Sequence, residues 1–520
     1  MKRLYTLVSV LLCVIMLLSA CTTGKVETSG NADASQATNS SNGSSTRTDI
    51  NLTLSSIGNS MDPHNSGVTI DLQVQEQIYE SLVHVDEKSQ VTPRLAKSYT
   101  VSDDGLVYTF ELRDDVFFHN NEKMKASDVV WSIERAMKSS QMATYCGPIE
   151  KVEATGDNTV EITLKYAFAP FINYLYMVKI MSEAEVTSAG DMFSSKVTHA
   201  GTGPYMLTTY EPSTKIVLNA FPNYYRGEAA IKTINYYVIT DSSSALIAFQ
   251  NGEIDFASIP TANWAEVEAS GQYANELVLS GDIRYLALNV GQKGPLADKR
   301  VRQAVQYALD KEAIAIIATD GLGVPADHMI AVGMYDGAVE TDWVYEYNID
   351  KCKELLAEAG YPNGVDIGVI ETATQRVVAE AVQAQLEAAG IKCKVLVGEA
   401  ATMVVDWRAG KYDMIVNRFP PAFTYDYYRR YNDYKIDVVF MKYNLNKDCD
   451  HEYITATFDK AAATMDKTER DAIYKELEEY LMDIAAWVPL FYPQIPYAWN
   501  KNLNAYGYMT YYEVYDWSWK

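Results

Sequence analysis

The alternation of helix-like and strand-like segments between residues 296 and 397 restricts the fold of this chain more than any other feature of its sequence. Helix-like segments have apolar residues every three or four positions, and strand-like segments are short runs rich in β-branched residues. The expected order is helices at 301–309, 352–359 and 378–389 and strands at 365–370 and 391–397. Asp298 and Asp350 are expected to cap the first two helices. This arrangement is typical of an α/β domain.

The rest of the chain follows other patterns and is too long for a single core. One hydrophobic core rarely grows beyond about 250–300 residues, and the chain has 520. Residues 107–165 combine alternating strands with one helix, residues 205–257 are mostly strand-like, and residues 488–520 contain short aromatic-rich extended segments. We therefore expect at least two packed domains with room for a cleft between them.

The N-terminus has the pattern of an exported lipoprotein. Two basic residues, Lys2 and Arg3, precede the mostly apolar residues 4–18, and the segment ends in Leu18-Ser-Ala-Cys21. This ending is similar to a bacterial lipobox, so we expect residues 1–20 to be removed as a signal peptide and Cys21 to carry a lipid. A transmembrane anchor is the alternative, but about 15 apolar residues are fewer than the roughly 20 that a span needs.

Residues 22–48 and the net charge indicate how the exported protein is attached and which partners it can have. Almost no side chain in 22–48 can be buried, so this segment is expected to be a flexible polar tether. The formal net charge is −24, whereas a protein that binds nucleic-acid phosphates needs a basic patch. Nucleic acid is therefore excluded as a partner, and the acidity is interpreted as a solubility feature.

The cysteines do not form a disulfide scaffold. Cys13 leaves with the signal peptide and Cys21 is the lipid site, which leaves Cys146, Cys352, Cys393 and Cys449. Cys352 shares the apolar face of its helix and Cys393 the apolar face of its strand, so both are expected to be buried thiols. One disulfide among the remaining four stays open at this point.

Motifs of catalysis and cofactor binding are absent from the sequence. There is no GxSxG, HExxH or GxxxxGK[ST] pattern, and no GxGxxG follows a strand. No two of the six histidines lie within ten positions of each other, so no local metal cluster is formed. We expect no enzyme activity, no cofactor and no metal site. A secreted hydrolase with an unfamiliar active site is the alternative from another functional class.

A set of motifs in fixed order resembles one known family. The chain is similar to family 5 of the extracellular solute-binding proteins, which includes the oligopeptide, dipeptide and nickel receptors of ABC importers. The matching segments are Pro93–Tyr99, Asp103–Arg113, Val116–His119, Ala126–Arg135, Gly201–Tyr205, Pro222–Tyr224, Asn289–Lys311, Leu355–Gly360 and Gly410–Asp413. Together they cover nearly all of the chain that follows the tether.

The resemblance implies a two-lobed α/β fold of the type II periplasmic-binding-protein kind, with an extra α+β subdomain in the first lobe. Crossing strands would form the hinge near 284–289 and near 488–490. The implied division is 1–20 signal peptide, 21–48 lipidated Cys21 and tether, 49–87 first lobe, 88–195 extra subdomain, 196–289 first lobe again, 290–487 second lobe and 488–520 return to the first lobe.

The resemblance also suggests which residues contact the ligand. In peptide-binding relatives an Asp after the Tyr-Asp strand pairs with the α-amine of the peptide, and here that position is Ala422, with Phe419 in place of the usual Trp. A buried ammonium without a carboxylate is costly, so Asp426 would have to replace the missing partner. Arg418 is suited to a carboxylate or phosphate. The candidate ligand-binding residues are Asn417, Arg418, Phe419, Tyr425, Asp426 and Tyr427, with Asp62 and His64 from the loop after the first strand. The alternative is that Arg418 is a surface charge and that the tyrosines pack in the core.

These observations predict a monomeric, lipid-anchored receptor on the extracytoplasmic face of a bacterial cell membrane. It would capture a small solute, expected to be a peptide or peptide-like molecule, and deliver it to the permease and ATPase subunits of an ABC importer. A receptor for nickel, a metallophore or an oligosaccharide within the same family is the alternative.

Overall fold

The computed structural model describes residues 47–520, apart from residues 57–59, 67–68, 87, 212, 292–293, 333–335, 342, 421–423, 433–440, 448 and 510. These residues belong to one compact unit that begins at Thr46. The predicted signal peptide, Cys21 and Ala422 lie outside the described residues, as does the predicted tether up to residue 46. Within the described part, no helix combines the length and the apolar character that a membrane span requires.

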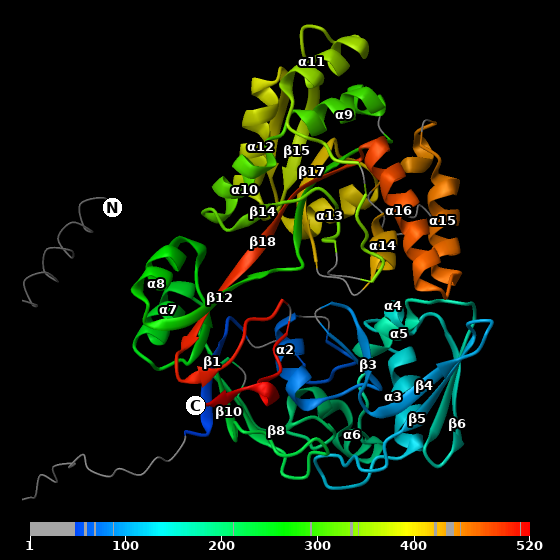
Figure 1. Cartoon of the computed structure of the whole chain (residues 1–520), viewed down its shortest axis with the longest axis vertical. Coiled ribbons are helices and arrows are strands. Elements are labelled where there is room, and N and C mark those ends of the chain that lie inside the picture. Colours follow the sequence, from blue (N-terminus) through cyan, green and yellow to red (C-terminus); the bar gives the residue numbers. More distant parts are fainter. Residues whose placement is uncertain are drawn as a thin grey trace, which may run out of the picture. The chain divides into compact units, whose positions relative to one another are not determined.

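The first lobe is built on a mixed sheet in which three strands run parallel. β1 pairs in parallel with β10 and β11, and β9 and β8 continue the sheet with antiparallel pairing. The strands are β1 (Asp49–Leu54), β8 (Tyr205–Glu211), β9 (Lys215–Ala220), β10 (Thr233–Val238) and β11 (Phe256–Ser258). The same lobe contains the helices α2 (Thr69–Ile78), α6 (Glu183–Ala189), α7 (Ser242–Gln250) and α8 (Trp264–Ser270), seen in Figure 1.

Strand β1 shows how the sequence directs this sheet. Ile50, Leu52 and Leu54 are at most 5% exposed, whereas the residues between them are half-buried. Successive side chains of a strand point to opposite faces, so this alternation places the three apolar side chains on the face that packs in the core. Tyr205, Tyr236 and Trp517 complete that core, which joins the start, the middle and the end of the chain.

The extra subdomain is a four-stranded antiparallel sheet covered by a helix. The sheet order is β4-β5-β7-β6, and the strands are β4 (Ala96–Val101), β5 (Val107–Leu112), β6 (Ile149–Gly156) and β7 (Thr159–Leu164). Helix α3 (Ala126–Met137) buries Val129 and Ile133 in the same core as Phe110 and Ile162. All of these elements lie inside the predicted range 88–195.

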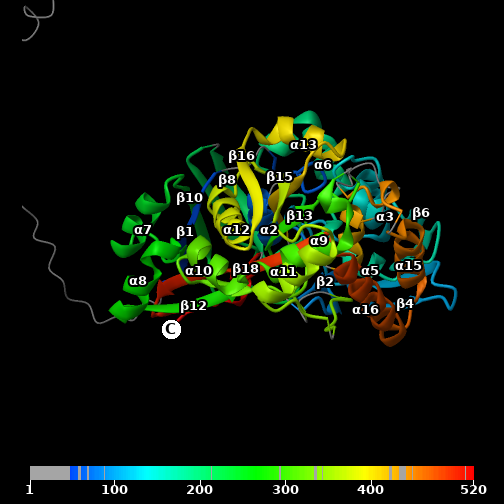
Figure 2. The ribbon, with the colours of Figure 1, turned by 90° about the horizontal axis from the view of Figure 1, so that it is seen from above.

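The second lobe has the predicted alternation of helices and strands. β15 is parallel to β16 and β17, and β13 is antiparallel to β17. The strands are β13 (Ile283–Leu288), β15 (Val365–Thr372), β16 (Ile391–Val397) and β17 (Met414–Phe419). The helices are α9 (Lys299–Tyr307), α10 (Lys311–Thr319), α11 (Ile349–Glu358), α12 (Arg376–Ala388), α13 (Ala400–Arg408), α14 (Arg429–Asn432), α15 (His451–Ala463) and α16 (Lys467–Ile484). Figure 2 shows α12 beside β16.

The predicted helix caps are correct in one case and wrong in the other. The Asp298 side chain accepts a hydrogen bond from the backbone N–H of Arg300 at the start of α9. Helix α11 begins earlier than predicted, and its cap is Asn348, which accepts from the N–H of Lys351. Asp350 instead lies in the first turn, where a carboxylate complements the positive end of the helix dipole.

The chain passes twice between the two lobes, once between β12 (Tyr273–Leu279) and β13 and once within β18 (Trp487–Asn500). β18 pairs with β13 over Trp487–Phe491 in the second lobe and with β12 in the first. Figure 1 shows β18 as a continuous strand that runs from one lobe to the other. The passages therefore lie at 280–282 and 492–493, a few residues from the predicted boundaries.

All four described cysteines are buried, as predicted for Cys352 and Cys393. None of them is joined to another described cysteine by a disulfide. Burial raises the pKa of the thiols of Cys146 and Cys393 to about 12 and that of Cys352 to about 11, so these three are unreactive thiols at neutral pH.

Candidate functional site

A cavity in the first lobe lies at the carboxyl ends of its parallel strands. Its volume is about 640 Å³, and its walls include residues at the ends of β1, β10 and β11. Six serine and threonine residues line it together with three aromatic residues: Thr53, Ser55, Thr240, Ser242, Ser258 and Thr261, and Phe256, Tyr497 and Tyr512. Ligands of open α/β sheets bind outside the carboxyl ends of the strands, so this cavity is the first-lobe half of the candidate site.

In the second lobe, two arginines lie at the corresponding edge of the sheet. Arg284 of β13 is directly opposite Arg418, near the carboxyl end of β17. Both approach one carboxylate, since Oδ2 of Asp282 lies 2.9 Å from Nη1 of Arg418 and 3.5 Å from Nη1 of Arg284. Nε of Arg284 donates to Oε1 of Gln375 at 3.0 Å, in the loop between β15 and α12. This cluster is the second-lobe half of the candidate site.

The two guanidinium groups differ in exposure. The Arg418 side chain is 53% exposed and that of Arg284 only 18%. Burial lowers the pKa of Arg284; Asp282 acts in the opposite direction, and the charge of Arg418 lowers the pKa further. Two positive charges thus share one negative charge at this edge, which leaves it cationic.

The other predicted residues of β17 point in different directions. Phe419 is 2% exposed and lies in a ring cluster with Tyr431, at a centroid distance of 4.6 Å, and with Tyr427 and Tyr428. Asn417 is half-buried, and its side-chain oxygen accepts from the backbone N–H of Arg418 at 2.8 Å. Phe419 therefore supports the wall behind Arg418.

The predicted residues that follow β17 are mostly interior. Tyr425 is 2% exposed, and its hydroxyl donates to the buried carboxylate of Glu478. Burial raises the pKa of both groups. Asp426 is 6% exposed and accepts from the hydroxyl of Tyr174 at 3.4 Å. For Tyr425 the structure supports the packing interpretation more than ligand contact.

Tyr427 is more accessible than its neighbours. It is half-buried, its hydroxyl accepts from Nη1 of Arg430 at 2.8 Å, and the same guanidinium lies 5.0 Å from the centre of its ring. A tyrosine held in this way offers a flat face and a hydroxyl of fixed direction. Of the three residues predicted after β17, Tyr427 fits a ligand contact best.

Asp62 and His64 are held by the first lobe itself. The Asp62 carboxylate is 2% exposed and binds Arg135 through two hydrogen bonds of 2.9 and 2.6 Å. His64 has no exposed surface, and its Nε2 lies 2.9 Å from the carbonyl oxygen of Lys179. Burial lowers the pKa of His64 to about 4, so it is neutral at pH 7. The structure does not bring this pair together with Arg418.

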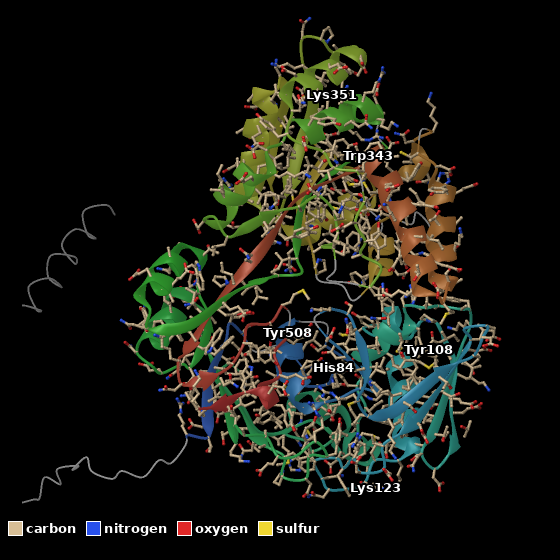
Figure 3. The ribbon with its side chains drawn as sticks, viewed as in Figure 1. His84, Tyr108, Lys123, Trp343, Lys351 and Tyr508 are labelled. Carbon is tan, nitrogen blue, oxygen red and sulfur yellow. The ribbon has the colours of Figure 1, made fainter. Side chains whose placement is uncertain are left out.

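The extra subdomain and the second lobe enclose a further cavity. It measures about 640 Å³ and lies among α4 (Ala143–Cys146), α5 (Phe171–Tyr174), α14 and α15. The backbone N–H of Ala169 donates to the carbonyl of Ala462 at 2.7 Å beside it. Met509, from the C-terminal segment, packs on the second-lobe core, whereas the adjacent Tyr508, labelled in Figure 3, packs on the first. The lobes are therefore in direct contact at this side.

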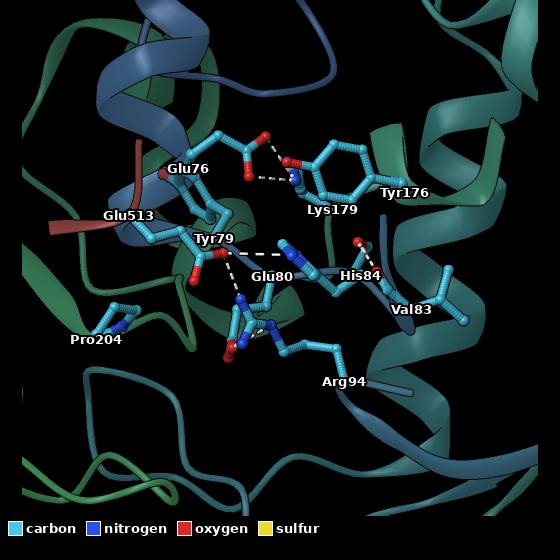
Figure 4. A pocket seen from close by; sticks show the side chains of 11 residues that line it. Glu76, Tyr79, Glu80, Val83, His84, Arg94, Tyr176, Lys179, Pro204 and Glu513 are labelled. Carbon is cyan, nitrogen blue, oxygen red and sulfur yellow. Dashed lines mark hydrogen bonds and ion pairs between the residues drawn. The ribbon is translucent and has the colours of Figure 1, made fainter. Parts of the chain in front are cut away.

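Figure 4 shows a cluster of charged residues that the sequence did not reveal. Nζ of Lys179 lies 2.7 Å from Oε1 of Glu76, and Arg94 binds both Glu80 and Glu513. The space between them is about 10 Å³, room for one water molecule at most. Glu513 belongs to the C-terminal segment, so Arg94 links that segment to Glu80, which follows α2.

The sequence reasoning also missed Arg284, Asp282 and Gln375. A signal was present, because Arg284 is the one charged residue in the otherwise apolar strand Ile283–Leu288. Its partner Arg418 was predicted, but the strand register that joins them was not. Among the described residues, no group of three or more His, Cys, Asp and Glu side chains is placed to hold a metal ion.

Comparisons with known proteins identify the family. The family model "Bacterial extracellular solute-binding proteins, family 5 Middle" matches residues 90–436, more than half of the chain. The glutathione-binding protein GsiB of Escherichia coli strain K12 is 28% identical over 485 residues, covering 89% of this chain and 92% of the relative.

Solved structures show the same fold. NikA from Brucella suis, solved in complex with Fe(III)-EDTA, superposes with a TM-score of 0.81 at 24% identity, covering 91% of this chain and 100% of that chain. AppA from Bacillus subtilis, an oligopeptide-binding protein solved with a nonapeptide, gives 0.72 at 23% identity, covering 91% and 99%. These matches confirm the predicted two-lobed α/β fold of type II periplasmic binding proteins. The chain belongs to family 5 of the bacterial extracellular solute-binding proteins, the substrate-binding proteins of ABC importers.

Proposed function

We propose that this protein captures a peptide or peptide-like solute outside the membrane and delivers it to the permease of an ABC importer. The observation that carries the proposal is the position of the two half-sites. One lies at the carboxyl ends of β1, β10 and β11, the other at the carboxyl ends of β15 and β17, and they belong to different lobes. A solute bound between them would contact both lobes at once.

Closure of the lobes on the solute is the second part of the proposal. The chain passes between the lobes through short segments, at 280–282 between β12 and β13 and near 492–493 within β18, and the lobes also touch beside α5. Hinges of this kind are a few residues at the ends of elements that absorb the change in backbone angles. Contacts made only in the closed form would raise affinity, and the permease would select that form.

A relative that is named for its ligand supports the proposed solute class. GsiB is named for binding glutathione, a tripeptide, and it aligns with 89% of this chain. The rings of Tyr497 and Tyr512 and the hydroxyls of Ser55 and Ser258 suit a solute with both apolar and polar groups. We propose that the protein carries out no chemistry on this solute.

Anchoring to the membrane is proposed from the sequence alone. Cys21 follows a lipobox-like segment, and two or more acyl chains hold a protein stably on a membrane because each buried CH₂ adds roughly 0.8 kcal/mol. Mass spectrometry of the protein extracted from membranes should find Cys21 acylated. An unmodified protein that retains residues 1–20, or one secreted without lipid, would contradict the anchor.

Thermal unfolding of residues 22–520 with a solute library tests the function. A bound solute stabilises the folded protein by RT ln(1 + [L]/Kd), about 2.7 kcal/mol at a hundredfold excess over Kd. We expect stabilisation by at least one short peptide. Stabilisation by a nickel chelate or an oligosaccharide instead would replace the peptide by another solute class of the family. Turnover of any such solute would overturn the receptor function.

A further inference from the structure

We propose that Arg284 and Arg418 together bind a carboxylate group of the solute, so that the solute must carry a free anionic group. This inference rests on the proposed function and names the chemistry of its second-lobe half-site. The two arginines face each other on neighbouring strands, at the edge where β15 and β17 end. They come from segments far apart in the sequence, and only the strand register joins them.

The hydrogen bonds of the pair show unused donor capacity. Asp282 is the acidic partner of both guanidinium groups, through the same oxygen atom. Nη1 of the buried Arg284 makes no hydrogen bond within the described part of the chain, although it lies 3.5 Å from that oxygen. Each guanidinium group has five N–H donors, so one carboxylate cannot satisfy the donors of two guanidinium groups. A second anion would complete the site.

Helix α12 adds positive potential at the same edge. Gln375, which accepts from Arg284, is the residue that precedes the helix, and no side chain caps the helix N-terminus. The first turn contains no acidic residue, and Arg376 within it is paired with Glu380. The N-terminus of a helix of 13 residues carries roughly half a positive charge. Among the described residues, these three sources of positive potential, the two guanidinium groups and the helix N-terminus, are paired with one carboxylate, that of Asp282.

The geometry favours a planar anion. Arg418 is half exposed while Arg284 is mostly buried, so an anion entering from solvent would meet Arg418 first and be held between the two forks. Two guanidinium groups that face one another match the paired oxygens of a carboxylate. A phosphate offers the same oxygens, so both sources of this chemistry are compared in the test. The structural alternative is that the pair only ties the loop at Gln375 to β13.

The experiment compares matched solutes on residues 22–520. A tripeptide library is prepared in two forms, with a free C-terminal carboxylate and with a C-terminal amide, and each form is screened by thermal shift and titrated by calorimetry. We expect the amide form to bind at least tenfold more weakly. Arg418→Gln and Arg284→Gln should weaken the carboxylate form at least tenfold and leave the amide form within twofold. Arg418→Gln keeps the test valid if Arg284→Gln fails to fold, because Arg418 is half exposed.

A matched variant controls for the loss of charge. Arg408→Gln removes the same charge from an exposed position at the end of α13 and should leave both affinities unchanged. Equal binding of carboxylate and amide forms would overturn the inference while leaving the receptor function intact. In another outcome no peptide binds, but acetate or inorganic phosphate stabilises the protein and Arg418→Gln removes that effect. The peptide proposal then fails and the anion site stands. The anion that stabilises the protein more shows whether the site prefers a carboxylate or a phosphate. If neither peptides nor simple anions have an effect, both proposals are overturned.

Discussion

The hydroxyl of Tyr174, in the extra subdomain, donates a hydrogen bond of 3.4 Å to the carboxylate of Asp426, in the second lobe. Both side chains are buried, at 4% and 6% exposure. Burial raises the pKa of Tyr174 well above its ordinary value, so the hydroxyl keeps its proton at neutral pH. The contact joins the two lobes beside the cavity that α4, α5, α14 and α15 enclose.

The first prediction concerns this contact. If solute binding closes the lobes, Tyr174→Phe removes a hydrogen bond that supports their approach, and a typical hydrogen bond contributes about 1 kcal/mol. We expect the Kd for a bound peptide to rise at least threefold in calorimetry. Tyr166→Phe, at a tyrosine that is 53% exposed in the same cavity wall, is the control and should change nothing. Equal affinities of Tyr174→Phe and the natural protein would contradict a role in closure.

The second prediction separates the structural role of Asp62 from a ligand contact. Asp62→Asn leaves the guanidinium of Arg135 without its carboxylate, and breaking a buried ion pair on one side costs about 3 kcal/mol or more. We expect a lower urea midpoint of unfolding and an unchanged Kd for the peptide. A variant of normal stability and weakened affinity would instead return Asp62 to the binding site, as the sequence suggested.

Much of the fold could be predicted because its signals are local. Strand 391–397 and its helix neighbours follow from apolar spacing that a few adjacent residues determine, and Asp298 caps α9 through the next residues in the chain. The extra subdomain was placed through motifs in the family's order. The passages between the lobes were predicted less precisely, because the sequence of strand β13 does not reveal which sheet the strand joins.

The site could be predicted only in part because its partners are distant in sequence. Arg418 was chosen as an anion ligand, but Arg284 and Asp282 reach it through the pairing of β13 with β17. Asp62 was chosen because its loop resembles the family's Asp-Pro segment that faces the cleft, and nothing near it in the sequence reveals Arg135 as its partner. Burial likewise emerges from tertiary packing, which is why Tyr425 and Tyr427 differ so much although they are only two positions apart.

The third prediction concerns pH. Burial lowers the pKa of His64 and of His119 to about 4, below the value of about 6.5 in an unfolded chain. Between these values the unfolded state binds protons that the folded state does not, so the free energy of unfolding falls as pH decreases from about 6.5 to about 4. At pH 5 each histidine lowers it by about 2 kcal/mol.

Urea unfolding at several pH values measures this dependence. His119→Gln removes one of the two groups, so the loss of stability between about pH 7 and about pH 5 should be smaller than in the natural protein. An identical pH dependence in His119→Gln would show that His119 does not lower acid stability.

The fourth prediction explains the Gly201-Thr-Gly-Pro segment by close packing. A Cβ on Gly201 would lie 2.1 Å from the carbonyl oxygen of Ile78 and 3.0 Å from the His119 ring. That oxygen cannot easily move, since it accepts the backbone N–H of Gly203 at 2.9 Å. Gly201→Ala should therefore lower the free energy of unfolding by about 3 kcal/mol, at the upper end for overpacked sites. Gly252→Ala, where a Cβ meets nothing within 4 Å but φ is +75°, should cost only about 1 kcal/mol. Equal urea midpoints for the two variants would show that the close approach to Ile78 of α2 does not require glycine at position 201.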